Sequence, residues 1–75
     1  MTAAEKRKIQ RALLALRKQR VLLKARLNRI DENLCRLPLG SRARFEVLAA
    51  RESIVEALRL NAIAIRNLRL VLHTC

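Results

Sequence analysis

A seven-residue repeat of apolar side chains runs through the first half of the chain and constrains the fold more than any other feature. It places Ile9, Leu13, Leu16, Leu23, Leu27, Ile30, Leu34 and Leu37 at alternating steps of four and three residues, with Arg20 taking one place in the series. This spacing puts the side chains on one face of an α-helix and is typical of a helix packed on another helix. Thr2 and Glu5 form the T-x-x-E pattern of a capping box. We therefore expect a helix over about residues 3–36.

The repeat is interrupted at Leu37-Pro38-Leu39-Gly40-Ser41. Proline disfavours helical backbone at the residue before it, Gly40 can adopt a left-handed turn, and Ser41 is a good N-cap. The sequence therefore predicts a turn over 37–41 and a second helix over about 42–72. That helix repeats the spacing with Val47, Ile54, Leu58, Ile65, Leu68 and Leu72. A short connection between long helices makes them antiparallel neighbours, so the expected fold is all-α, a single-domain two-helix hairpin over residues 1–75.

Three polar residues, Arg20, Arg51 and Asn61, occupy places in the two apolar seams. Two interpretations are open. The long arginine stems can lie over the core while their heads reach water, or the three residues can form a polar layer that fixes register or oligomeric state. An antiparallel hairpin is expected to bring Arg20 close to Leu58 and Asn61.

The chain has more apolar side chains than one hairpin can cover. Leu60 and Leu70 lie off the two seams, as do five further residues, Leu14, Val21, Leu22, Ile63 and Val71. Soluble monomers rarely expose large apolar patches, and small domains often need a partner chain to complete a core. We expect these five residues at a homodimer interface, most simply in a four-helix bundle. The alternative is that they dock on a different protein.

Basic residues concentrate in the first helix. The chain has 17 Lys+Arg against 6 Asp+Glu, a net charge of +11. We expect an exposed basic ridge formed by Arg7, Lys8, Arg11, Arg17, Lys18 and Lys24. Acids of the second half can pair across the hairpin, Glu52 with Arg26 and Glu56 with Lys24. Self-repulsion of this size costs stability, so an anionic partner is the simplest reason to retain it, with a solvated face for solubility as the alternative.

The composition favours duplex nucleic acid among the possible anions. Single-strand binders stack bases on aromatic side chains, and Phe45 is the only aromatic residue. The apolar runs are too short for a membrane span, and Trp is absent, so no membrane partner is expected. Duplex binding needs only basic side chains at fixed spacing. Because no DNA-reading motif is present and A-form RNA is recognised by shape, double-stranded RNA is preferred, with DNA left open.

Catalysis is not expected. The sequence has no nucleophile–base set and no Gly-rich phosphate loop, and Cys35, Cys75 and His73 lack metal-ligand spacing. We expect no enzyme activity, no metal, no cofactor and no small-molecule substrate. The cysteines are interpreted as reduced thiols of an intracellular, cytoplasmic protein. A straight hairpin keeps them at opposite ends, which excludes a disulfide within one chain but not one between chains.

An Arg- and Leu-rich hairpin of this kind resembles the double-stranded-RNA-binding suppressors of RNA silencing of nodaviruses and, as a second choice, the Rop-type RNA-binding hairpins of plasmids. The resemblance is architectural, covers the whole chain, and rests on the Thr2–Leu37 repeat, the turn and the basic ridge. The first family implies a homodimer that binds duplex RNA of any sequence and shields it from processing in the host cytoplasm. The second implies control of plasmid copy number. The alternatives are a helical adaptor that docks an acidic partner and a DNA-binding regulator.

Overall fold

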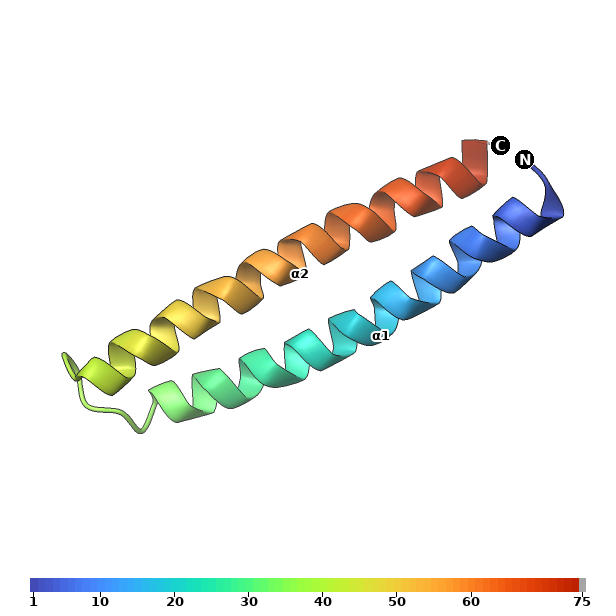
Figure 1. Cartoon of the computed structure of the whole chain (residues 1–75). Helices are drawn as coiled ribbons and strands as arrows, with labels where there is room; N and C mark the ends of the chain where they lie inside the picture. The colour runs from blue at the N-terminus through green and yellow to red at the C-terminus, as the bar shows by residue number, and fades with distance from the viewer. Residues whose placement is uncertain (75) are drawn as a thin grey trace.

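The computed structural model describes residues 1–74 and consists of two long antiparallel helices (Figure 1). Helix α1 spans Ala3–Leu34 and helix α2 spans Arg42–Thr74. The molecule is a rod of 55 × 15 × 13 Å. Figure 1 shows the turn at one end and, at the other, the start of α1 beside the last turns of α2. The predicted all-α hairpin is confirmed.

The helix starts follow the local sequence. The Thr2 hydroxyl accepts a hydrogen bond of 3.2 Å from the backbone N–H of Glu5 and donates one of 3.2 Å to the Glu5 carboxylate. At the second helix, Ser41 Oγ accepts from the backbone N–H of Arg44 at 3.2 Å. Gly40 has a φ of 77°, in the left-handed region that glycine adopts without strain. The two N-caps and the turn glycine therefore form as expected. The capping box is incomplete, because the Glu5 carboxylate accepts from the Thr2 hydroxyl rather than from the Thr2 backbone N–H.

The end of α1 differs from the expectation because a side chain completes it. Helix α1 ends at Leu34 rather than near residue 36, while α2 continues to Thr74, two residues beyond the expected end. The Arg44 guanidinium donates to the carbonyl oxygens of Leu34 at 2.7 Å and Leu37 at 3.4 Å. The Leu34 carbonyl also accepts from the backbone N–H of Leu37 at 3.3 Å, so the Arg44 bond adds a second donor there. The guanidinium also places a positive charge where the helix dipole favours it.

The core between the helices is thin. Within residues 1–74 the only buried apolar side chains are Leu13 and Leu23, which are 5% and 9% exposed. The accessible surface is 5957 Å², against about 4,700 Å² for a compact monomer of this mass. The radius of gyration is 17.0 Å, whereas a compact chain of this length has about 11 Å. A single hairpin therefore leaves roughly 1,200–1,300 Å² more surface in water than a compact monomer does.

Two arginines in the seam link the helices. Arg20 lies beside Leu58 as expected, and its Nη1 donates a long hydrogen bond of 3.5 Å to the Leu58 carbonyl oxygen. Arg51 Nε donates to Asp31 Oδ1 at 2.8 Å, in a partly exposed ion pair. The heads of both arginines thus make polar contacts across the hairpin. This favours the polar-layer interpretation of the seam over heads that only reach water.

Asn61 is the most buried residue of this polar layer, with 4% of its surface exposed. Its Nδ2 donates to the Leu16 carbonyl oxygen at 2.9 Å and to Gln19 Oε1 at 3.2 Å. Its Oδ1 is buried and has no hydrogen-bond partner among residues 1–74. Most buried polar atoms in proteins are paired, so this oxygen is an unusual feature of the isolated hairpin.

Candidate nucleic-acid interface

All six residues of the basic ridge are exposed: Arg7, Lys8, Arg11, Arg17, Lys18 and Lys24. The ion pairs among residues 1–74 involve Arg42, Arg51 and Arg59. No carboxylate in this part of the chain therefore neutralises a ridge residue, and all six charges can meet an external anion.

The ridge is broader than one line of side chains. At about 100° per residue, Arg17 and Lys24 lie beside the seam, on one side of it, and Lys8 lies on the opposite side. The other three members, Arg7, Arg11 and Lys18, lie on the surface of α1 that is farthest from α2. Only Arg17 and Lys24 therefore lie next to α2 on a shared side of the hairpin.

Two shallow grooves run between the helices, one on each side of the hairpin, and they show which α2 residues lie on the same side as Arg17 and Lys24. One groove is lined by Leu16, Gln19, Ala57, Leu60, Asn61 and Ala64. The other is lined by Arg20, Ala62, Ile65, Arg66, Arg69, Leu70 and His73. Since Gln19 and Arg17 lie on opposite sides of the α1 seam, Arg17 and Lys24 share the side of the second groove. We call this side the basic flank; it comprises Arg17, Lys24, Arg66, Arg69 and His73.

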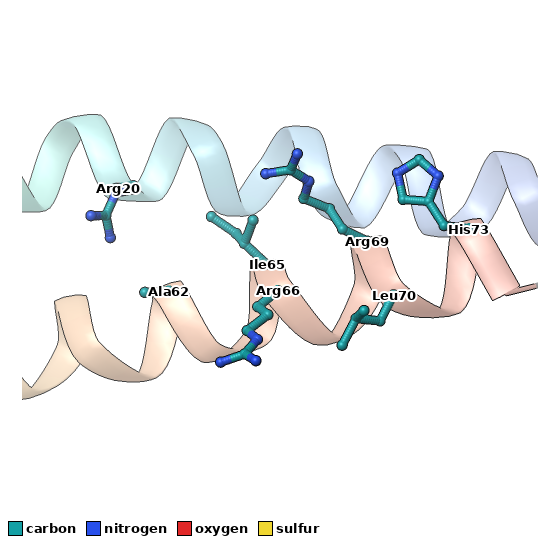
Figure 2. Close-up of a pocket in the computed structure, with 7 residues that line it drawn as sticks. All are labelled: Arg20, Ala62, Ile65, Arg66, Arg69, Leu70 and His73. Carbon is teal, nitrogen blue, oxygen red and sulfur yellow. The ribbon is translucent and has the colours of Figure 1, made fainter.

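The groove of the basic flank has a volume of about 400 Å³ (Figure 2). Its floor is apolar, formed by Ala62, Ile65 and Leu70. Figure 2 shows Arg69 and His73 reaching from α2 toward α1, while Arg20 comes from α1. No acidic side chain lines this groove. Sequence reasoning missed Arg66 and Arg69, because they belong to the second helix, whose net charge is small.

The opposite side of the hairpin carries almost no charge. We call it the neutral flank; it comprises Ala12, Ala15, Gln19 and Leu22 of α1 and Ala50, Ser53, Ala57, Leu60, Ala64, Asn67 and Val71 of α2. Charged residues follow only where these rows continue beyond those bounds, at Lys8 and Arg26 on α1 and at Glu46 on α2. The α2 members repeat at steps of three and four residues, so they form a second continuous stripe beside the seam. The hairpin therefore has two unlike flanks.

Charge is also divided along the rod. The contacts of Arg20 with Leu58 and of Asn61 with Leu16 set residues 57–74 beside residues 1–22, and this half contains 10 basic residues and one acid, a net charge of +9. The half near the turn, residues 23–56, contains seven basic and five acidic residues, a net charge of +2. The sequence signal for this division is that no acid follows Glu56. An anion is therefore attracted to the half of the rod that is far from the turn.

The expected cross-hairpin ion pairs do not form. Glu56 instead accepts two hydrogen bonds from Arg59 of its own helix, at 3.0 and 2.6 Å. These bonds lower the pKa of the Glu56 carboxyl below its ordinary value and raise the pKa of the Arg59 guanidinium. Glu52 has no ion pair among residues 1–74. Lys24 therefore keeps its charge free, whereas Arg59 already has a carboxylate partner.

The five residues expected at the dimer interface are all exposed but do not share one side. Leu22 and Val71 lie on the neutral flank, and Ile63 lies on the surface of α2 farthest from α1. Leu14 and Val21 lie on the other side of α1, four and three residues from Lys18. Side chains at these spacings are neighbours on a helix, so a partner that covers Leu14 and Val21 also covers Lys18.

Residues 1–74 were also searched for a metal site and for a membrane-spanning helix. No three His, Cys, Asp or Glu side chains in this part of the chain come together as a metal site. Neither helix, over the residues described, has a stretch long and apolar enough to cross a membrane. Cys35 is an exposed free thiol, and Cys75 lies outside the described residues. Comparisons with protein-family models, curated proteins and solved structures found no match.

Proposed function

We propose that this chain, as a homodimer, binds double-stranded RNA through phosphate contacts and without sequence preference. The observation that carries the proposal is the group of exposed, unpaired basic side chains, most of them on a half of the rod that contains one acid, Glu5. These are the six ridge residues together with Arg66 and Arg69. Phosphate contacts fix the position of a protein on a duplex but read no bases, so a surface of this kind binds many sequences alike.

The geometry favours a duplex over a single strand. Arg17 and Lys24 are seven residues apart on one helix, which separates them by about 10 Å along a stiff axis. Rigid spacing suits a regular array of phosphates, whereas single-strand binding relies on aromatic stacking. Phe45, the only aromatic side chain, lies near the turn, outside the basic half. An α-helix cannot insert into the narrow major groove of A-form RNA, so contact runs along phosphates and 2′-hydroxyls.

A rod bound along a duplex excludes other proteins from the same stretch of RNA. Shielding from a duplex-cleaving nuclease is therefore the proposed consequence of binding, and no catalytic group of the chain takes part in it. The expected readout is slower cleavage of duplex RNA at protein concentrations that saturate binding. Cleavage of single-stranded RNA by a single-strand-specific nuclease is expected to stay unchanged.

The test is a titration of labelled duplex RNA, duplex DNA and single-stranded RNA, each in two unrelated sequences and at several salt concentrations. We expect equal affinity for the two RNA duplexes and weaker binding of single strands. Six phosphate contacts give a log–log salt slope of about −5, from about −0.9 per contact on DNA. Flat salt dependence, one preferred sequence, or binding of an acidic protein in place of any nucleic acid contradicts the proposal.

A further inference from the structure

The neutral flank lacks a partner in the isolated hairpin. Two of its side chains, Leu60 and Val71, are 54% and 43% exposed. The excess surface of the hairpin is about 1,250 Å² per chain, so covering it in two chains buries about 2,500 Å². That area lies in the range of obligate homodimers, about 2,000–5,000 Å². The hairpin therefore has enough uncovered surface for a stable dimer.

Charge selects the neutral flank as the contact surface between two copies. Each copy carries a net charge of +11, so contact through the basic flank or the outer surface of α1 sets like charges against each other. Between Ala50 and Val71 the neutral flank of α2 carries no ionisable side chain, and its alanines allow close approach of two helices. A second copy of the chain therefore meets least repulsion on this flank.

Asn61 supplies an independent reason for a partner at this place. It lines the groove of the neutral flank, and its buried Oδ1 has no donor within the chain. The neighbouring Gln19 uses its Oε1 to accept from Asn61, so its side-chain NH₂ has hydrogens to donate. A second copy brings a second Gln19 amide to this groove. A partner with such a donor satisfies an oxygen that the isolated hairpin leaves unpaired.

This polar cluster lies near the middle of the rod. The midpoint of α1 falls between residues 18 and 19, and that of α2 falls at Leu58, close to Asn61. In a two-fold dimer, equivalent residues meet at the symmetry axis. An axis that crosses the rods at mid-length therefore sets each Gln19–Asn61 cluster beside its copy and overlaps the full lengths of both hairpins.

The division of charge along the rod sets the orientation. With both turns at the same end, the two halves of net charge +9 lie side by side. With the turns at opposite ends, each of these halves lies beside a half of net charge +2. The second arrangement has less like-charge repulsion. It also places residue 26 of one α1 opposite residue 12 of the other, so Arg26 meets alanine rather than another cation.

We propose that two copies of this chain form a four-helix bundle through their neutral flanks, with the turns at opposite ends and the two-fold axis near Gln19 and Asn61. Helix α1 packs against its copy, and α2 packs against its copy. The outer surfaces of both α1 helices, with Arg11 and Lys18, then lie on one side of the bundle. This contact surface replaces the interface expected from the sequence, which included Leu14 and Val21. The inference deepens the homodimer of the proposed function and rests on no property of RNA.

The contact surface is tested with two matched substitutions. Leu60 and Leu70 lie on the same helix and are 54% and 52% exposed, but Leu60 is on the neutral flank and Leu70 lines the groove of the basic flank. Light scattering without RNA is expected to give a dimer for the wild-type chain and for Leu70→Glu, and a monomer for Leu60→Glu. Circular dichroism at the same concentration reports whether each variant keeps its helices. A dimeric Leu60→Glu, or a monomeric Leu70→Glu that stays helical, overturns the proposal.

The orientation is tested with a spin label on the exposed thiol of Cys35, in a Cys75→Ser chain. Residue 35 is about 16 residues from the midpoint of α1, so opposed turns separate the two labels by about 50 Å. Turns at the same end bring the labels within about 25 Å, given helix spacings of 8–10 Å. A short distance contradicts the orientation, whatever the RNA titration gives. A long distance together with absent RNA binding upholds the dimer and overturns only the proposed function.

Discussion

The side chain of Asn61 donates a hydrogen bond of 3.2 Å to Gln19 Oε1 across the hairpin seam. A second bond of 2.9 Å to the Leu16 carbonyl oxygen holds the same amide in place, while Oδ1 remains buried without a partner. A leucine here would continue the apolar seam. A single polar residue in such a seam is known to fix register and oligomeric state at a cost in stability. We interpret Asn61 in this way.

Replacement of Asn61 by leucine is therefore expected to raise the stability of the fold and to make the oligomeric state less specific. Asn61→Leu removes a buried oxygen without a partner and adds apolar contact, so the free energy of unfolding is expected to rise by about 1 kcal/mol. Urea unfolding measures that change, and analytical ultracentrifugation is expected to show more than one oligomeric species. A loss of stability of several kcal/mol, with one clean species, contradicts this role for Asn61.

Arg44 is expected to matter more than the neighbouring Arg42. Its guanidinium donates to the carbonyl of Leu34, the last residue of α1, at 2.7 Å and to that of Leu37 at 3.4 Å, whereas Arg42 is 94% exposed at the side chain and pairs only with Glu46. Arg44→Ala is expected to lower the free energy of unfolding by about 1.5–2 kcal/mol, since hydrogen bonds from a charged group are lost. Arg42→Ala serves as the control, with a change below about 0.5 kcal/mol. Equal losses in the two variants contradict the capping role.

Gly40 is expected to be sensitive through its backbone alone. An added Cβ would meet no atom within 4 Å, but φ is 77°. Gly40→Ala is therefore expected to cost about 1–2 kcal/mol in thermal or urea unfolding, because alanine is strained in the left-handed region. Gly40→Asn is expected to cost less, as asparagine tolerates this conformation better. Unchanged stability in the alanine variant refutes the argument.

The hairpin itself could be predicted because its signals are local. The spacing of the apolar residues, the hydroxyl of Ser41 and the left-handed Gly40 all act within a few residues of the chain. The end of α1 could not be predicted from the same signals. It depends on Arg44, which lies ten residues further along and reaches back to Leu34 only after the turn has formed.

The two flanks could not be predicted from either helix by itself. Helical spacing shows that Arg17 and Gln19 lie on opposite sides of α1, but only the contact between Gln19 and Asn61 shows which α2 residues share each side. The contribution of Arg66 and Arg69 to the basic flank could not be predicted for a related reason. The net charge of residues 31–75 combines residues 31–56, with a net charge of −1, and residues 57–75, with a net charge of +3.

The most direct test of RNA binding by the basic half compares two double variants with equal loss of charge. Arg17→Gln/Arg69→Gln removes two cations from the basic flank, and Arg36→Gln/Arg42→Gln removes two near the turn. Binding of duplex RNA to the first variant is expected to weaken about tenfold for every sequence, with a salt slope reduced by about 2, whereas the second is expected to stay within about twofold of wild type. Equal weakening of both variants, or of neither, contradicts the account.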